Sequence, residues 1–321
     1  MSTILSCDWG TTIFRIRLID ISSHTILNEI SSHEGIASTY HSWKTRTSPQ
    51  DRFSFFLNVI GQKIKEMEQD LSLSFVNIPI LLSGMASSSL GLLELPYKSM
   101  PFKADGSNLL THTIEPTNSF PHEIFFISGV NTSNDVMRGE ETKLVGSYEN
   151  EDGIFIFPGT HSKHIHVQNG IVTNFATYMT GEIFDAISKG TILSNSIKSD
   201  NYLSNPKYQR SFRIGVRTGY NSNILHSCFS ARTNTLFNKF SKEENYFYLS
   251  GLLIGNELSD LKVMHDQKIT LSGSEILVNL YRDAFKILGL VDSAALQIRD
   301  GADTLIKGQL SLYKMFSKQL A

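Results

Sequence analysis

Apolar residues recur along the chain with either a helical or a strand spacing, and the two spacings together predict alternating strands and helices. Apolar residues recur at three- and four-residue steps from Phe53 to Leu71, which predicts an amphipathic helix. Short apolar or alternating runs bounded by turn residues predict strands. Strands are expected near 4–9, 14–19, 25–30, 78–82, 124–127, 154–157, 164–167, 171–175 and 268–271, and further helices at 136–148, 275–288 and 302–317. This alternation predicts an α/β fold.

The first strand runs into a turn that is suited to phosphate. Asp8 ends the strand, and Gly10, Thr11 and Thr12 form the turn to the second strand. Because glycine has no side chain, an anion can approach the N–H groups of such a turn, and the two hydroxyls add donors. Asp8 is placed to hold Mg²⁺ through water beside the same phosphates. Taken alone, the segment favours an ordinary hairpin turn over a phosphate site.

A second turn of this kind favours the phosphate interpretation for both. The strand at 154–157 leads into Gly159 and Thr160, with Ser162 and Lys163 just beyond, and another strand follows. Two such turns facing each other across a cleft would hold an oligophosphate. Neither turn has the second glycine and Lys-Ser/Thr pair of the phosphate loop of nucleotide triphosphatases.

The repeat also divides the chain into two predicted domains. The first, 1–150, holds the first turn and the candidate base and sugar contacts, and the second, 151–321, holds the second turn. The polar stretch 149–153 is the expected boundary. Whether the last helix packs back on the first domain is left open by the sequence.

A third glycine at a strand end follows in the second predicted domain. Gly273 lies between the strand at 268–271 and the helix at 275–288. A strand–Gly–helix junction forms a flat surface beside a helix N-terminus, where the purine of a nucleotide could lie. A tight connection without a ligand is the alternative. As the third such turn in order, Gly273 fits the adenosine position.

Composition limits the partners of the protein. The chain has 29 basic and 31 acidic residues in 321, so it lacks the charge excess that nucleic-acid or anionic-membrane binding favours. Its two cysteines, Cys7 and Cys228, favour free thiols over a disulfide. No signal-peptide pattern and no run of eighteen apolar residues is seen. We therefore expect a cytoplasmic protein that binds neither nucleic acid nor a membrane. A small-molecule substrate and a homodimer are both compatible with this composition.

The order of these motifs resembles that of the superfamily of sugar kinases, Hsp70 and actin. Longer strings narrow the resemblance to the 2-dehydro-3-deoxygalactonokinase family. These are DWGTT at 8–12, DVMRGEET at 135–142, PGTHSK at 158–163, MTGE at 179–182 and LSGLLIG at 249–255. The resemblance covers the chain from Asp8 to Gly273. It implies a two-domain, ribonuclease H-like α/β fold with an interdomain cleft, and ATP and Mg²⁺ as cofactors.

The activity that the resemblance implies is ATP-dependent phosphorylation of the 6-hydroxyl of 2-dehydro-3-deoxy-D-galactonate, in D-galactonate breakdown. One alternative is a kinase of the same fold that acts on another sugar acid or a hexose. Another is a non-catalytic, nucleotide-dependent switch, which the absence of room for a peptide-binding domain disfavours. The loop 84–97 would decide the acceptor, and here Leu92 stands where the family tends to have tryptophan.

Asp135 is the expected catalytic base, because related glucokinases carry theirs as Asn-Asp at this place in the chain. A purely structural role as a helix N-cap is the alternative. Glu140 and Glu141 are further candidates for the base, although acids early in a helix more often face solvent. Arg138 is suited to a bidentate pair with the substrate carboxylate or to the γ-phosphate.

The remaining sugar contacts are expected just after the strand at 78–82. Gly84, Met85, Ser87 and Tyr97 are the candidates, because a polyhydroxy acid needs hydroxyl and amide partners. Ordinary loop polarity explains these residues nearly as well. His161, His164 and His166 do not predict a zinc site, because no Cys or carboxylate cluster accompanies them.

Overall fold

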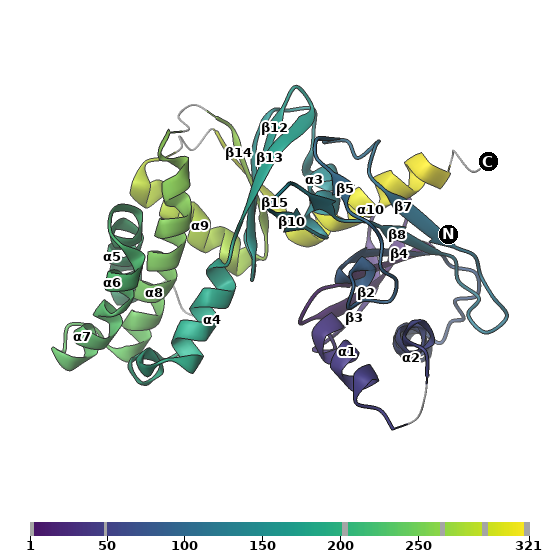
Figure 1. Ribbon diagram of the computed structural model, residues 1–321, viewed down its shortest axis with the longest axis horizontal. Coiled ribbons are helices and arrows are strands. Elements are labelled where there is room, and N and C mark those ends of the chain that lie inside the picture. The colour runs from purple at the N-terminus through teal and green to yellow at the C-terminus, as the bar shows by residue number, and fades with distance from the viewer. Residues whose placement is uncertain (1–2, 48–49, 201–204, 264–266, 291–294, 318–321) are drawn as a thin grey trace. The chain divides into compact units, whose positions relative to one another are not determined.

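The computed structural model describes residues 3–47, 50–200, 205–263, 267–290 and 295–317 and forms two compact units (Figure 1). Unit 1 contains Met1–Glu151, Val167–Asn174 and Gly301–Ala321, and unit 2 contains Asp152–His166 and Phe175–Asp300. None of the helices in the described residues is long and apolar enough to cross a membrane.

Unit 1 is built on a six-stranded sheet in the order β3-β2-β1-β4-β8-β7. Three strands form an antiparallel meander: β1 (Thr3–Trp9), β2 (Phe14–Asp20) and β3 (Ile26–Ser32). On the other side of β1 lie β4 (Ile80–Gly84), parallel to β1, β8 (Ile124–Ile127), parallel to β4, and β7 (Thr111–Ile114), antiparallel to β8. β1 and β4 thus end at the same edge of the sheet, where Asp8 and Gly84 lie.

A second, small sheet in unit 1 carries two of the candidate site residues. Its strands are β5 (Lys98–Ser99), β9 (Val130–Asn131) and β10 (Val136–Met137), in the order β10-β9-β5. β9 and β10 are antiparallel, and the turn between them contains Asp135. Arg138 directly follows β10.

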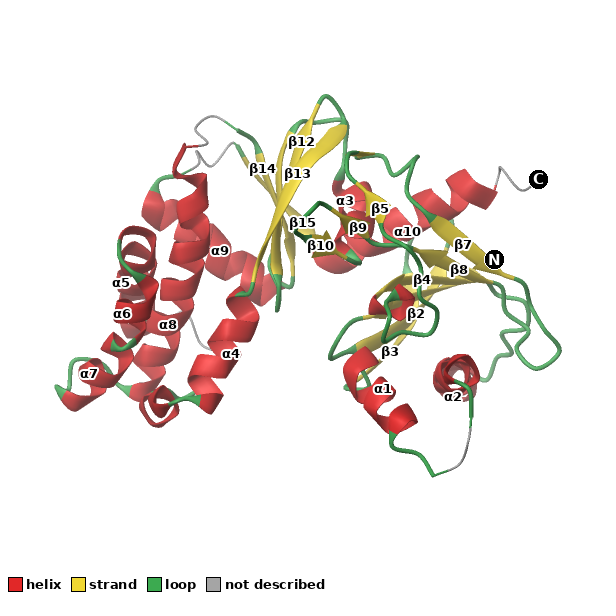
Figure 2. Cartoon of the chain, in the orientation of Figure 1, coloured by secondary structure: helices red, strands yellow, loops and turns green. Residues whose placement is uncertain are grey.

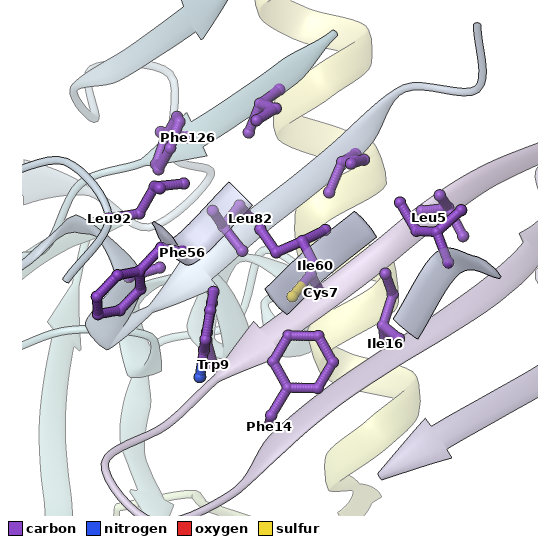
Figure 3. Packing of buried hydrophobic residues seen from close by; sticks show 14 of the residues in the cluster. Leu5, Cys7, Trp9, Phe14, Ile16, Phe56, Ile60, Leu82, Leu92 and Phe126 are labelled. Carbon is purple, nitrogen blue, oxygen red and sulfur yellow. The ribbon is translucent and has the colours of Figure 1, made fainter. Parts of the chain in front are cut away.

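The helix predicted from Phe53 to Leu71 is confirmed as α2 (Arg52–Leu71), which packs on the core of unit 1 (Figure 3). It begins after Asp51, whose side chain accepts the N–H of Ser54. Its buried stripe consists of Phe56, Ile60, Ile64 and Met67. The ring of Phe56 lies 5.2 Å from that of Trp9, so the residue after Asp8 is anchored in the core. Two shorter segments are α1 (Ile36–Lys44) and the 3-10 turn η1 (Met85–Ser87).

Two helices of unit 1, α3 (Glu140–Ser147) and α10 (Gly301–Ser317), cross in close contact through glycine. A Cβ on Gly146 would lie 1.8 Å from the carbonyl oxygen of Thr304, and one on Gly308 would lie 1.9 Å from that of Thr142. Larger residues at either position would force the helices apart.

The side chain of Gln309 ties α10 to the central strands of unit 1. This buried amide donates to the carbonyl oxygens of Cys7 (3.1 Å) and Leu81 (3.2 Å), and its oxygen accepts the hydroxyl of Ser6 (2.5 Å). Its polar atoms are therefore satisfied inside the sheet region. The contacts hold β1 one and two residues before Asp8, and β4 three residues before Gly84.

The second large sheet has the order β15-β14-β11-β12-β13-β6. Read as β13-β12-β11-β14-β15, five of its strands repeat the order β3-β2-β1-β4-β8 of the first sheet, whereas the sixth strand lies at the opposite end. The strands are β11 (Gly153–Phe157), β12 (Ser162–Gln168), β13 (Ile171–Tyr178), β14 (Ile269–Gly273), β15 (Leu296–Asp300) and the edge strand β6 (Phe102–Lys103). β14 is parallel to β11 and β15 to β14, just as β4 is parallel to β1 and β8 to β4. This order of five strands is that of the ribonuclease H-like fold implied by the resemblance, so the predicted α/β, ribonuclease H-like fold is confirmed.

Unit 2 holds a helical layer, seen as the group of red helices around α8 in Figure 2. It contains α4 (Thr180–Gly190), η2 (Ile192–Ser196), α5 (Pro206–Asn221), α6 (Ile224–Cys228), α7 (Ser230–Leu236), α8 (Lys242–Glu257), η3 (Leu258–Val263) and α9 (Glu275–Leu288). α5 and α8 cross at glycines spaced four residues apart on each helix. A Cβ on Gly219 would lie 1.9 Å from the Leu252 oxygen, and one on Gly255 would lie 2.1 Å from the Val216 oxygen.

Among the predicted boundaries that are wrong, two change the local setting of site residues. The helix expected at 136–148 begins only at Glu140, because Val136 and Met137 pair with β9 and Gly139 has a φ of 110°, outside the helical region. The strand expected at 164–167 already begins at Ser162. The polar residues Ser162 and Lys163 hid this start, although the structure buries both.

Candidate functional site

The first Gly-Thr turn is held rigidly by its own hairpin and by the start of α1. The N–H of Gly10 donates to the Ile13 oxygen (2.9 Å), and the Gly10 oxygen accepts the N–H of Ile36 (2.9 Å). A Cβ on Gly35 would lie 2.4 Å from the Thr11 oxygen, so α1 begins in direct contact with the turn. The side chains of Thr11 and Thr12 are exposed. The predicted phosphate contacts therefore lie on a fixed, accessible turn.

Asp8 lies beside two glycines that have unusual backbone conformations. It pairs with Ser83 across β1 and β4, and a Cβ on Gly84 would lie 3.2 Å from the Asp8 carboxylate and 2.9 Å from the Trp9 oxygen. Gly84 has a φ of +83°, and a Cβ on Gly139 would in turn lie 3.3 Å from the Gly84 Cα. Asp8, Gly84 and Gly139 therefore meet at the carboxyl edge of the parallel strands, where ligands bind in open α/β sheets.

Glu141 is the buried acid of this group. Its carboxylate accepts the N–H of Gly139 (2.7 Å) and the hydroxyl of Thr142 (3.0 Å). Burial, followed by the charge of Glu140, raises the pKa of Glu141 from 4.5 to about 7. The expectation that acids early in this helix face solvent is therefore wrong for Glu141, which is 0% exposed.

The structure brings Arg138 together with Ser87 and Tyr97. Nη1 of the guanidinium donates to the carbonyl oxygen and to the hydroxyl (2.7 Å) of Ser87. Nη2 donates to the carbonyl oxygen of Leu95 (3.4 Å). It lies over the Tyr97 ring at 4.1 Å from the centroid. The Ser87 hydroxyl itself is buried and donates to the Ile127 oxygen (3.1 Å). No carboxylate in the described residues forms an ion pair with this guanidinium, and its buried Nε has no hydrogen-bond partner there.

Asp135 lies in the turn of the β9–β10 hairpin, half exposed. Its N–H donates to the Thr132 hydroxyl (2.8 Å), its carbonyl oxygen accepts the N–H of Thr132 (2.9 Å), and its carboxylate accepts the N–H of Val136 (2.7 Å). Because α3 begins only at Glu140, the alternative role of Asp135 as a helix N-cap is wrong. Met85 follows Gly84 directly and opens the turn η1.

Leu92 lies in the apolar core of unit 1, at 2% exposure. Its position in the loop 84–97 thus has a packing role.

In unit 2, the second Gly-Thr turn lies against the start of α4. A Cβ on Gly181 would lie 2.6 Å from the Gly159 oxygen and 2.8 Å from the Thr160 Cα, and the N–H of Glu182 donates to the Thr160 oxygen (3.1 Å). Gly159 itself has open space where a Cβ would be. Gly273 lies near the same turn, since its Cβ would be 3.5 Å from the Pro158 ring. The structure therefore brings the predicted phosphate and adenosine glycines of this unit together.

Ser162 and Lys163 do not lie in that turn. Both are buried in β12. The Ser162 hydroxyl donates to the buried carboxylate of Glu257 (2.7 Å), and the Lys163 ammonium donates to the His161 oxygen (3.2 Å).

A cavity of about 260 Å³ opens beside the Gly159 turn, entirely within unit 2. One end is formed by Gly159, Thr180 and Gly181. The walls are apolar and aromatic side chains of α4, α8 and α9, among them Phe184, Tyr246, Leu253, Leu277 and Tyr281. Such walls suit a flat heterocycle. The sequence placed a purine near Gly273 but did not indicate these walls, because their residues read as ordinary helical core.

The sequence analysis also missed a buried polar group under this cavity, centred on Glu257. Its carboxylate accepts Ser162 Oγ (2.7 Å), His164 Nε2 (2.8 Å), Tyr281 Oη (2.6 Å) and the Thr180 hydroxyl. Burial works to raise the pKa of Glu257, but the His164 hydrogen bond and charge, with the bonds from Thr180 and Tyr281, outweigh it and lower the pKa. Glu257 is the last residue of α8, and nothing in its sequence position marked it.

The described residues contain no group of three or more His, Cys, Asp or Glu side chains that could hold a metal ion. His164 pairs with Glu257 and His161 with Glu182 (2.5 Å). A lone carboxylate such as Asp8 is a donor set that fits Mg²⁺, which is commonly bound by one or two carboxylates together with phosphates and water.

Comparison with known proteins identifies the family. The family described as 2-keto-3-deoxy-galactonokinase matches residues 8–311. The chain is 29% identical over 221 residues to a protein of Escherichia coli K12 named 2-dehydro-3-deoxygalactonokinase, covering 66% of this chain and 71% of the relative. It is also 29% identical over 301 residues to a protein of Rhizobium meliloti 1021 named as a probable 2-dehydro-3-deoxygalactonokinase, covering 88% of this chain and 89% of that one.

A solved structure leads to the same family. It is a crystal structure from Sinorhizobium meliloti assigned as a 2-dehydro-3-deoxygalactonokinase, with a TM-score of 0.78 and 26% identity over 97% of this chain and 96% of that one. The chain therefore belongs to the 2-keto-3-deoxy-galactonokinase family, a family of phosphotransferases with an alcohol group as acceptor.

Proposed function

We propose that this protein transfers the γ-phosphoryl group of ATP to the 6-hydroxyl of 2-dehydro-3-deoxy-D-galactonate. Family membership over residues 8–311 supports the reaction class. The environment of Arg138 supports a sugar acid as the acceptor. Its guanidinium is half-buried, is held by Ser87 and Tyr97, and has no carboxylate partner in the described residues. Such a group is suited to the carboxylate of a sugar acid.

In unit 1 we assign the acceptor and the metal. Arg138 binds the acceptor carboxylate, while Ser87 and Tyr97 hold the guanidinium in place. Gly84 and Met85, at the adjoining strand end, approach the sugar. Asp8 holds Mg²⁺ through water, and Gly10, Thr11 and Thr12 contact phosphate. When bound, Mg²⁺ neutralises charge on the transferred phosphoryl group.

In unit 2 we assign the nucleotide. Gly159 and Thr160 contact the phosphates through a turn that leaves room for them. Gly273 and the cavity between α4, α8 and α9 accept the adenosine. Because Ser162 and Lys163 lie buried in β12, we assign them to support of this turn and not to direct contact with phosphate.

Asp135 is assigned as the base. It takes the proton of the 6-hydroxyl as the hydroxyl oxygen bonds to the γ-phosphorus and the bond from phosphorus to the β–γ bridging oxygen breaks. ADP, the phosphomonoester and one proton are the products. A carboxylate at the tip of a short, hydrogen-bonded hairpin is accessible to a substrate hydroxyl and fixed in direction.

A coupled ADP-release assay with Mg-ATP tests the proposal against an acceptor panel. The panel contains 2-dehydro-3-deoxy-D-galactonate, its gluconate epimer, D-galactonate, glucose and glycerol. We expect fast turnover with the first acceptor and little with the others. Turnover only with glucose or glycerol would contradict the role of Arg138, and no turnover with any acceptor would contradict the kinase assignment.

A further inference from the structure

The buried Glu257 carboxylate joins four elements of unit 2. It accepts hydrogen bonds from Ser162 and His164 on β12, from Thr180 in the first turn of α4 and from Tyr281 on α9. Glu257 is 3% exposed, and Ser162 and His164 are 0% and 1% exposed. A carboxylate with four donors around it is fully satisfied, and its bonds are strong because the group is charged and shielded from water.

Two of these donors lie next to segments that shape the Gly159–Thr160 turn. Ser162 follows the turn by two residues on β12. Thr180 precedes Gly181 and Glu182, the residues that touch the turn from α4. Gly181 leaves no room for a Cβ against Gly159, and the N–H of Glu182 donates to the Thr160 oxygen. The Glu257 carboxylate therefore holds both the strand after the turn and the helix end packed on it.

The remaining donors link the same carboxylate to the nucleotide cavity. Tyr281 and Thr180 both line the cavity, and Gly159 forms part of its end. Burial and the Glu257 charge raise the pKa of Tyr281 well above its usual value, so its phenol stays protonated and donates to the carboxylate. Thr180 and Tyr281 can touch a ligand in the cavity, but Glu257 is not among the described residues that line it and does not lie on the Gly159 turn, so the effect of the carboxylate itself is indirect.

We propose that Glu257 is a positioning residue for the nucleotide phosphates. The Glu257 carboxylate fixes Thr180 and β12 and so sets the shape of the Gly159–Thr160 turn. The turn then contacts the phosphates directly. This inference rests on the proposed assignment of unit 2 to the nucleotide. It extends that assignment to a residue that touches neither nucleotide nor acceptor. Removing the carboxylate should thus weaken binding of the phosphates and leave binding of the adenosine part unchanged.

The test compares ADP with adenosine, which lacks the phosphates, by titration calorimetry on the full chain. In Glu257→Gln a single amide oxygen replaces the two oxygens that accept four donors. We expect the Kd of Mg-ADP to rise at least tenfold, while the Kd of adenosine stays within twofold of the wild type. Thr180→Val, which removes one donor at the start of α4, should give a smaller loss of the same kind. It keeps the test valid if Glu257→Gln does not fold.

Asp260→Asn is the matched control. Its carboxylate accepts a tyrosine hydroxyl in the same unit, Tyr178 Oη at 2.7 Å, whereas the Thr180 hydroxyl donates to Glu257. We expect its Kd for Mg-ADP to equal that of the wild type. Equal losses for ADP and adenosine in Glu257→Gln and Thr180→Val, or no loss in either, would overturn the positioning role. If wild-type protein bound neither ligand, the nucleotide assignment itself would be wrong, and the inference with it.

Discussion

Replacing Glu141 by Gln should remove a pH-dependent cost from the stability of unit 1. The pKa of Glu141 is about 7 in the folded chain, against 4.5 for an ordinary glutamate. The folded state thus binds the proton more tightly than the unfolded state. At about 1.4 kcal/mol for each pKa unit, the difference between 4.5 and 7 corresponds to about 3 kcal/mol.

The sign follows from which state holds the proton. Below pH 4.5 the carboxyl is protonated in both states and contributes no pH dependence. Between pH 4.5 and about 7 the unfolded chain loses the proton while the folded chain keeps it, so stability falls as the pH rises. Above about pH 7 the full cost of burying the charge is present. Glutamine carries no such cost. The free energy of unfolding of the variant therefore rises relative to that of the wild type by up to about 3 kcal/mol across this range.

Tryptophan fluorescence measures this effect in unit 1 alone, because Trp9 and Trp43 are the two tryptophans of the chain and both lie there. Urea unfolding of wild type and variant at several pH values from 4.5 to 8 gives the difference in free energy at each. The amide substitution also adds a pH-independent offset to the difference in unfolding free energy, which does not change how that difference varies with pH. Glu94→Gln, at an exposed position of the same unit, should follow the wild type. A difference between Glu141→Gln and wild type that is flat from pH 4.5 to 8 would refute the reasoning.

Three further predictions concern the reaction and the packing. Asp135→Asn should keep the fold and the KM for ATP but lower kcat by about 10²- to 10⁴-fold in the ADP-release assay; near-normal turnover would place the base elsewhere. Arg138→Lys keeps the charge but loses the fork and the stacking on Tyr97, so the KM for the sugar acid should rise at least tenfold while the KM for ATP stays constant. An equal rise in both KM values would argue against carboxylate binding. Gly255→Ala should destabilise unit 2 by about 1–3 kcal/mol by circular dichroism melting, because its Cβ would lie 2.1 Å from a carbonyl oxygen, whereas Gly190→Ala, with open space, should be neutral or stabilising. Equal stability of the two variants would contradict this account of the helix crossing.

The sequence was sufficient to predict elements with a strong local pattern. The α2 stripe and the α9 helix follow from apolar spacing and flanking residues, and the two Gly-Thr turns indicated that each half begins with a strand, a turn and a strand. Local patterns decide such elements because one face of each is buried against the core. The same patterns gave the order of the motifs and hence the family.

The predictions that were wrong concern residues whose pairing or hydrogen-bond partners are distant in sequence. Val136 and Met137 read as the start of a helix but pair with β9, and Ser162 reads as a turn residue but is buried against Glu257. A buried polar residue is stable only with its partner, and the partner of Ser162 lies 95 positions away. For the same reason the sequence did not point to Glu257, the proposed positioning residue, whereas it pointed to Arg138, the proposed carboxylate contact, because the motif of Arg138 is local.

The most direct test of the central proposal is to identify the product by ³¹P NMR after incubation with Mg-ATP and 2-dehydro-3-deoxy-D-galactonate. We predict a phosphomonoester on the primary 6-carbon, seen as a triplet from coupling to the two protons of that carbon, in an amount equal to the ADP formed. Free phosphate with ADP but no phosphomonoester, or a phosphomonoester on a secondary carbon, would contradict the account.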